Sequence, residues 1–335
     1  MSTVLFMRFN KNQGALIADE STWHLSFKYG YRRTNYGDSI LNLFEKENNI
    51  AAVYAGTGFP SFHYEVARKT RNILKKDNSK YKTIEDISNI IFPIYQEVHE
   101  RYINDKLKMM FGFTRDELNA LSFERNGKKY EIKQDILIQE AKKYLKFQNK
   151  SDSAIRIFEN SGIIMGYDPE YGINGYWLEH QQKAIDFASH LGVIGEGSTI
   201  ANKVFSETIN KMHLSERRKG FNLLDGLFIL IKAAIETKKV QCGMGGNFQL
   251  FLIDHNHTKE ILNNNIHLAS EVVQAYLWGF IDLKNTYGFI ENLLINDADF
   301  LEMEEKLFTS TNQSDTLKKY LMGYKPVNTG DRINN

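Results

Sequence analysis

The sequence predicts an α+β protein in which two antiparallel sheets and pairs of helices form a four-layer αββα sandwich. Strand and helix patterns follow one another in the order strands, two helices, strands, two helices, strand. Hairpins separate the helix pairs, which favours antiparallel pairing. The chain has 335 residues, 42% hydrophobic and 13% aromatic, which is sufficient for a large core.

The first half of the chain opens with strand patterns. Residues 2–10 carry apolar residues on both strand faces, which indicates a buried strand. A polar turn joins them to a second strand at 15–21, so the two form a hairpin. Residues 24–33 alternate weakly and are expected to extend the sheet. Residues 39–44 and 50–58 form a further strand pair that ends in glycines.

Two helices follow this strand pair. Residues 59–76 place apolar residues on one helical face and basic residues elsewhere. Residues 83–107 form the second helix, for which Thr83 is a favourable N-cap. Pro93 lies within this helix and predicts a kink.

The middle of the chain, at about 108–154, is an insert with less regular patterning. Within it we expect a hairpin around Asn126-Gly127 and a helix over 135–147. Residues 151–182 return to strands and tight turns.

The second half repeats the strand and helix order. It contains a short strand, a Gly-rich turn and a helix over 187–212, an apolar helix over 222–240, and a strand within 242–258. From about residue 262 the pattern is mainly helical. We therefore expect a main domain at 1–258 and a helical C-terminal extension with a polar tail at 259–335.

Composition excludes several function classes. The net charge of +1, without long runs of one sign, argues against a nucleic-acid or membrane-surface partner. The single cysteine, Cys242, excludes an internal disulfide and a cysteine-rich metal site. No stretch approaches the ~20 apolar residues of a membrane span, and no secretory signal is recognisable, so we expect a cytoplasmic protein. We expect no cofactor, and no metal at His255 and His257, since two histidines in a polar turn are usually solvated.

Four stretches in this order resemble the proteasome β-subunit and HslV-like branch of the N-terminal nucleophile (Ntn) hydrolases. They are STVLFMRF, GALIADES, SILNLFEKENNIAAVYAGTG, and GVIGEGSTIANKVF followed by LLDGLFILIKAAIETKKVQCGMGGNFQLFLID. The resemblance covers about 1–75 and 155–258. Each motif alone is weak, but four in the right order are much stronger.

The resemblance implies that the first mature residue supplies the nucleophile. A Ser or Thr hydroxyl needs a base within hydrogen-bond reach, and a free α-amine with a pKa near ~7.7–8.0 provides one at neutral pH. Removal of Met1 would expose Ser2, which strand-on-strand comparison places at the nucleophile position. Counting back from Asp19 favours Thr3 instead. We favour Ser2.

The remaining site residues are also implied by the resemblance. Asp19 matches the acidic residue by type, whereas Glu20 matches it by its distance from Gly14. The backbone N–H of Gly56 would be the oxyanion donor.

The substrate groove follows from the same resemblance. Tyr54 would line the pocket for the acyl-side residue of a peptide or amide substrate, and Thr22 and Trp23 would flank the groove. For Tyr54, a place as an aromatic side chain in the core is the alternative.

The sequence departs from the family pattern at the residues that polarise the nucleophile. The family lysine falls on Ser39, the serine of the Gly-Ser-Gly turn is Glu196, and the aspartate before the Gly-Gly strand is Gln241 or absent. Either Ser2 works with its own amine and a new carboxylate, Glu196, or the fold is retained without proteolysis.

Two functions therefore compete. The first is an Ntn hydrolase that cleaves a peptide or other amide bond through an acyl-enzyme. The second is a catalytically inactive proteasome-like structural or assembly subunit. A homo-oligomer is expected in either case, and the sequence identifies no ATPase partner.

Overall fold

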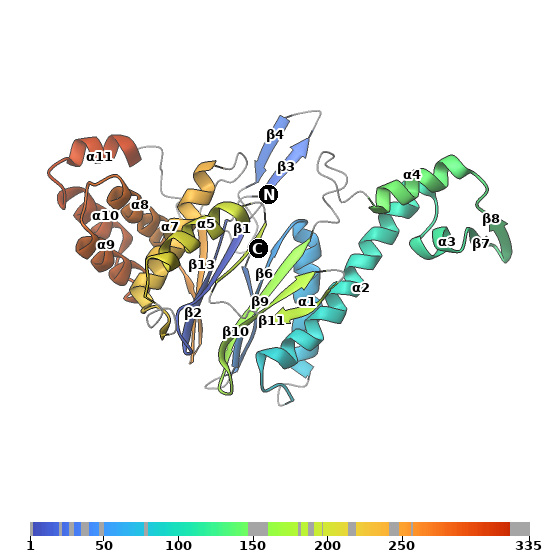
Figure 1. Ribbon diagram of the computed structural model, residues 1–335, viewed down its shortest axis with the longest axis horizontal. Helices are drawn as coiled ribbons and strands as arrows, with labels where there is room; N and C mark the ends of the chain where they lie inside the picture. Colours follow the sequence, from blue (N-terminus) through green and yellow to red (C-terminus); the bar gives the residue numbers. More distant parts are fainter. Residues whose placement is uncertain are drawn as a thin grey trace.

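The computed structural model describes residues 3–19, 22–26, 30–34, 40–46, 50–76, 80–146, 160–179, 182–186, 191–195, 197–213, 219–240, 248–255 and 257–321. Two five-stranded sheets form the centre of this described part, and helices lie outside both of them (Figure 1). Every strand pair is antiparallel. The mixed α/β class and the antiparallel pairing are as predicted.

The first sheet contains the predicted N-terminal hairpin. β1 lies between β2 and β12, and residues Thr3 to Met7 are buried as the apolar pattern predicts. The strand order is β12 (Leu191–Gly195), β1 (Thr3–Arg8), β2 (Gln13–Asp19), β13 (Phe248–Asp254) and β14 (Thr258–Ile261).

The second sheet has the predicted strand pair at one side. β6 is buried along its whole length between β9 and β5. The strand order is β11 (Gln182–Asp186), β10 (Gly172–Glu179), β9 (Ser161–Asp168), β6 (Ile50–Thr57) and β5 (Ile40–Lys46).

The two sheets pack face to face through an apolar cluster. Val4 and Phe6 of β1 meet Val53 and Ala55 of β6 in this cluster. The alternate residues of β1, such as Leu5, belong instead to the core between the first sheet and its helices. Side-chain alternation along β1 therefore distinguishes a face toward the second sheet from a face toward the helices.

Helices from two parts of the sequence cover the first sheet. α5 (Ser198–Asn210) and α7 (Leu223–Val240) share one core with α8 (Asn263–Leu277). The following helices extend this side of the molecule (Figure 1): α9 (Leu283–Ile290), a π-helical turn at Glu291–Ile295, α10 (Phe300–Thr309) and α11 (Ser314–Leu321).

The predicted domain boundary after residue 258 lies between elements that pack together around the first sheet. β14 begins at Thr258 and pairs with β13, and α8 packs on the first sheet. The division into two domains stays a prediction.

The helices α1 (Pro60–Lys76) and α2 (Ile84–Phe111) cover the second sheet. Thr83 is the N-cap of α2: its side chain accepts a hydrogen bond from Asp86 N, while the Asp86 carboxylate accepts one from Thr83 N. This capping box confirms the predicted helix start. α2 contains Pro93 and continues past it to Phe111.

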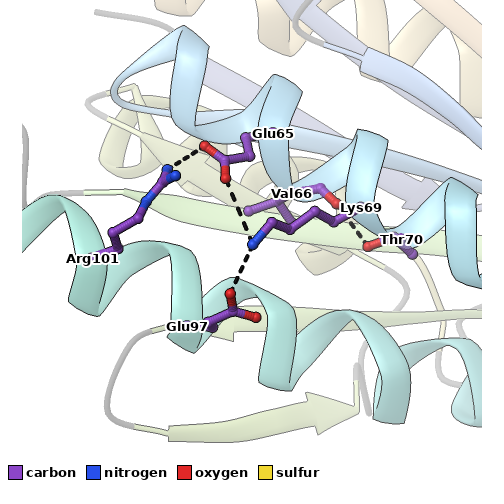
Figure 2. Close-up of polar contacts among 6 residues, drawn as sticks. All are labelled: Glu65, Val66, Lys69, Thr70, Glu97 and Arg101. Carbon is purple, nitrogen blue, oxygen red and sulfur yellow. Dashed lines mark hydrogen bonds and ion pairs between the residues drawn. The ribbon is translucent and has the colours of Figure 1, made fainter.

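Ion pairs join α1 and α2 across their exposed faces. Figure 2 shows Lys69 Nζ between two carboxylates, 2.8 Å from Glu97 Oε1 and 3.7 Å from Glu65 Oε1. Arg101 pairs with the other oxygen of Glu65. Because Lys69, Glu97 and Arg101 are 33% to 67% exposed and only Glu65, at 13%, is mostly covered, the network fixes the helix pairing more than it adds stability.

The insert forms an arm at one end of the molecule (Figure 1). α3 (Arg115–Asn119), the hairpin β7 (Ser122–Arg125) and β8 (Lys128–Glu131), and α4 (Asp135–Lys146) share a small core of their own. Asn126 and Gly127 have φ values of 54° and 72°, as the predicted tight hairpin turn requires.

One strand prediction is wrong. Residues 24–33 do not extend the main sheet: β3 (Thr22–Ser26) and β4 (Gly30–Thr34) pair with each other as a separate two-stranded sheet. The weak alternation of this segment supplies no continuous apolar face to pack on a large sheet. Within the described ranges, no helix combines the length and apolar character of a membrane span.

Candidate active site

Four strand ends of the first sheet lie at one edge. Thr3 is opposite Gly195, so the start of β1 meets the end of β12. Val4 is opposite Ala18, and Asp19 is opposite Phe248, so the end of β2 meets the start of β13 at the same edge.

Three strand ends of the second sheet lie on the same side of the molecule. Gly56 near the end of β6 is opposite Gly162 near the start of β9, and Ile40 at the start of β5 is opposite Ala55. Gln249 of the first sheet bridges to this edge: its Oε1 accepts from Ile40 N at 2.9 Å, and its Nε2 donates to Ile40 O at 3.1 Å. We call the two adjoining edges the candidate edge.

Thr3 is fully buried at the candidate edge. Its Oγ1 accepts a hydrogen bond from Gly197 N at 3.0 Å, which ties the start of β1 to the N-cap of α5. A Cβ at Gly197 would lie 2.0 Å from Thr237 Cγ2 and 2.6 Å from Thr3 Oγ1, so only glycine fits there. Because it alternates with Val4, the Thr3 side chain lies on the helix-facing side of the sheet.

Asp19 is 3% exposed at the end of β2. Its neighbour Ala18 belongs to the cluster between the sheets, whereas Ile17 belongs to the core on the helix side. Strand alternation therefore puts Asp19 on the same face as Thr3. The structure brings these two predicted residues together on adjacent strands.

Gly56 lies directly against a histidine of α1. A Cβ at this position would be 2.1 Å from His63 Nδ1, and a Cβ at the opposing Gly162 would be 2.9 Å from the Tyr54 ring. The paired glycines thus make space for the two rings on the helix side of the second sheet. The turn from β6 into α1 uses another glycine, Gly58, with a φ of 121°.

Tyr54 and His63 form a buried hydrogen-bonded pair. His63 Nε2 lies 2.9 Å from the Thr57 carbonyl, which can only accept, so Nε2 carries the proton and Nδ1 accepts from the Tyr54 hydroxyl at 2.6 Å. Burial lowers the pKa of His63 from 6.5 to about 4, opposed by the bond to Thr57. Burial and the nearby Tyr95 raise the pKa of Tyr54 above its ordinary value.

The environment of Tyr54 bears on its predicted role. Its side chain has no exposed surface and packs with the helices α1 and α2. The ring would have to become accessible before it could line a substrate groove, so that role stays a prediction.

Several predicted residues cannot be located. Ser2, Glu20 and Glu196 lie outside the described residues, and for Thr22 and Trp23 only the backbone in β3 is described.

Sequence reasoning missed His63 and Gln249. A signal for His63 existed, since it falls on the apolar face of α1 with Val66 and Ala67. The sequence contains no local signal for the role of Gln249, because its partner Ile40 is 209 residues away.

The other end of β13 carries Asp254, His255 and, after the turn, His257. Among the described residues, no group of three or more His, Cys, Asp and Glu side chains is arranged to hold a metal. His257 N donates to Asp254 Oδ1 at 3.0 Å, as in an ordinary turn. The prediction of no metal at His255 and His257 remains a prediction.

This sheet and helix arrangement is proteasome-like, as comparison with solved structures shows. The structure is similar to Anbu (ancestral beta-subunit) from Yersinia bercovieri, with a TM-score of 0.54, 10% identity, and coverage of 83% of this chain and 93% of that chain. It is similar to the protein in the helical assembly of the Anbu complex from Pseudomonas aeruginosa, with a TM-score of 0.53, 10% identity, and the same coverages. No protein-family profile matches the sequence, and neither does a curated protein. The similarity therefore establishes the fold.

Proposed function

We propose that the chain is a proteasome-like Ntn hydrolase whose fold is the four-layer αββα sandwich. Ser2 is the proposed nucleophile, and the substrate is a peptide or another amide. The observation that carries the proposal is the candidate edge: the start of β1, the end of β2 and Gly56 of β6 adjoin one another between two facing sheets. A nucleophile at the start of β1 would have an acidic residue and a backbone donor within the same small region.

Alternation along β1 supports Ser2 over Thr3. Even-numbered residues of this strand, Val4 and Phe6, face the second sheet, on which Gly56 lies. Thr3 faces the helices, is fully buried, and already accepts the Gly197 N–H. A hydroxyl on the even-numbered face has access to the gap between the sheets, where a substrate carbonyl would meet the Gly56 donor.

Strand pairing between β1 and β2 also indicates which acidic residue lies beside Ser2. Val4 pairs with Ala18, so continued pairing would set residue 20 opposite residue 2. We therefore propose Glu20 as the carboxylate beside the nucleophile, and Asp19 as a buried residue on the opposite face, beside Thr3. Glu196 is a second proposed carboxylate, because both of its sequence neighbours, Gly195 and Gly197, contact Thr3.

The proposed reaction needs no cofactor. The Ser2 hydroxyl attacks the amide carbon, its proton passes to the α-amine, and the tetrahedral oxyanion receives a hydrogen bond from Gly56 N–H. The protonated amine then gives its proton to the leaving nitrogen, which departs and leaves an ester on Ser2. Water, deprotonated by the same amine, hydrolyses this ester. Tyr54, Thr22 and Trp23 stay candidates for substrate contact.

A second candidate function is a catalytically inactive structural or assembly subunit. Ser39 in place of the family lysine favours it, since that lysine helps to polarise the nucleophile in the family the sequence resembles. A homo-oligomer is proposed under both functions, and the helical assembly named for the similar Pseudomonas aeruginosa protein is in keeping with it. A cytoplasmic location is part of the same proposal.

Covalent labelling tests the proposed function. Purified protein is treated with an α′,β′-epoxyketone or a β-lactone probe, and wild type is compared with Ser2→Ala, Ser2→Thr and Thr3→Val. We expect labelling of wild type and Ser2→Thr, none of Ser2→Ala, and labelling of Thr3→Val at a temperature where circular dichroism shows it folded. Labelling that survives Ser2→Ala but is lost in Thr3→Val would move the nucleophile to Thr3. No labelling of any form would favour the assembly subunit.

A further inference from the structure

A cavity of about 260 Å³ lies at the open side of the two sheets, next to the candidate edge. Residues of β5, α1, β13 and β14 line it. Because β5 and β14 are the edge strands of their sheets, no further strand of the described sheets covers this side. The cavity is therefore a gap between two edges and distinct from the start of β1.

Two polar bridges across the sheets bound the cavity. One is the pair of hydrogen bonds from Gln249 to Ile40. In the other, Asn42 Nδ2 donates to Thr258 Oγ1 at 3.2 Å, and Glu45 accepts from Thr258 N at 3.3 Å and from Thr258 Oγ1 at 3.2 Å. These bridges hold β5 at a fixed distance from β13 and β14, which keeps the cavity open.

The inner wall of the cavity is apolar. Ile40 and Phe251, which belong to the cluster between the sheets and are 1% and 4% exposed, line its inner side, and Leu41 lines it from the helix-facing side of β5. An apolar wall behind a few polar groups is the usual composition of a small-molecule site.

Two opposite charges line the cavity without pairing with each other. Arg71 Nε donates to the Asn42 carbonyl at 2.7 Å, while its Nη groups make no hydrogen bond or ion pair with the described part of the chain. Glu260 Oε1 accepts from Gln249 Nε2 at 3.2 Å, and Glu260 forms no ion pair with a described residue. The backbone bond holds the guanidinium in place with its fork of donors available.

We propose that this cavity binds a free α-amino acid with an apolar side chain. Arg71 receives the ligand carboxylate, Glu260 receives its ammonium group, and Ile40 and Phe251 receive its side chain. A ligand with only one charge would leave either Arg71 or Glu260 without a partner. This selectivity for zwitterions follows from the unpaired charges and does not depend on the proposed hydrolase activity.

Calorimetric titration of the full chain with L-leucine tests the proposal. N-acetyl-leucine, which lacks the ammonium group, and leucinamide, which lacks the carboxylate, are the comparison ligands. We expect leucine to bind, and each derivative to bind at least about tenfold more weakly, because each loses one charge-assisted contact, either with the half-buried Arg71 or with the exposed Glu260.

Variants assign the binding to this cavity. Arg71→Met and Glu260→Gln should each weaken leucine binding at least about tenfold, whereas Lys75→Met, an exposed position on the same helix, should leave it unchanged. Absence of leucine binding at millimolar concentration would overturn the proposal. Equal binding by wild type, Arg71→Met and Glu260→Gln would overturn it as well. Ser2→Ala should still bind leucine, so loss of the proposed hydrolase activity does not affect this result.

Discussion

Acidification is expected to destabilise the protein through one buried side chain, His63. Its ring fills the space opposite Gly56, with Nε2 bound to the Thr57 carbonyl and Nδ1 to the Tyr54 hydroxyl. Protonation would place a charge in this enclosed site and put a second proton on the ring, at Nδ1, which now accepts the hydrogen bond from Tyr54. The neutral form is therefore strongly preferred in the folded protein.

The magnitude follows from the pKa difference between the two states. Burial lowers the pKa of His63 from 6.5 to about 4 in the folded protein. Between pH 6.5 and pH 4 the unfolded chain binds a proton at this residue and the folded chain does not, so the free energy of unfolding falls as the pH falls. At 1.36 kcal/mol for each pKa unit, the loss is about 3 kcal/mol. Above pH 6.5 both states are neutral and His63 contributes no pH dependence.

Urea denaturation from pH 8 to pH 4, followed by tryptophan fluorescence, measures this loss. Other groups titrate in the same range, so the informative quantity is the difference between wild type and His63→Gln. The variant should be less stable at pH 8 but should lose about 3 kcal/mol less on acidification. His255→Gln, at an exposed position at the end of β13, is the matched control and should follow wild type. Equal pH dependence in wild type and His63→Gln would refute the reasoning.

Three further substitutions, together with Gly288→Ala as a control, test the packing, a helix cap and an ion-pair network by denaturant unfolding. Gly56→Ala should destabilise by ~3 kcal/mol or more, because its Cβ would fall 2.1 Å from His63, whereas Gly288→Ala, in open space on α9, should be stabilising by up to ~1 kcal/mol. Thr83→Ala should cost about 1 kcal/mol, since it removes the N-cap acceptor of α2. Lys69→Met should cost less than ~1 kcal/mol, and the loss should shrink in high salt.

Each of these substitutions has a result that would count against its explanation. Gly56→Ala as stable as wild type would mean that His63 does not occupy the space beside the glycine. No loss in Thr83→Ala would mean that the capping box is not formed in solution. A salt-independent loss of several kcal/mol in Lys69→Met would mean that this charge network is buried.

Local signals in the sequence predicted most of the strands and helices. The apolar pattern of residues 2–10, the N-cap Thr83 and the dipeptide Asn126-Gly127 each define an element through neighbours only a few residues away, and the structure has all three elements. Such signals depend on backbone preferences and on side-chain periodicity, both of which are properties of short segments.

Features that depend on contacts between distant parts of the chain could not be predicted from local sequence signals. β3 and β4 form a separate two-stranded sheet. Whether a strand joins a larger sheet depends on the strand edges and apolar faces that distant parts of the chain provide, and these are not visible in a short segment. The bridge from Gln249 to Ile40 joins residues 209 positions apart, and the fit of His63 against Gly56 depends on α1 folding back over β6.

The candidate site was likewise predictable in part from the sequence. The resemblance implied a site formed by Asp19, Gly56 and the start of β1, and the ends of their strands lie at the candidate edge, while their roles stay predictions. The choice between Ser2 and Thr3 could not be made from spacing, because strand-on-strand comparison favours Ser2 whereas counting back from Asp19 favours Thr3. Only the packing of alternate β1 residues distinguishes the two faces.

The most direct test of the account is the intact mass of the purified chain before and after reaction with an epoxyketone probe, with fragmentation to locate the adduct. The account predicts loss of Met1 and one adduct on Ser2. Retention of Met1, a free Ser2 that never reacts, or an adduct on another residue would contradict the claim that Ser2 is the nucleophile.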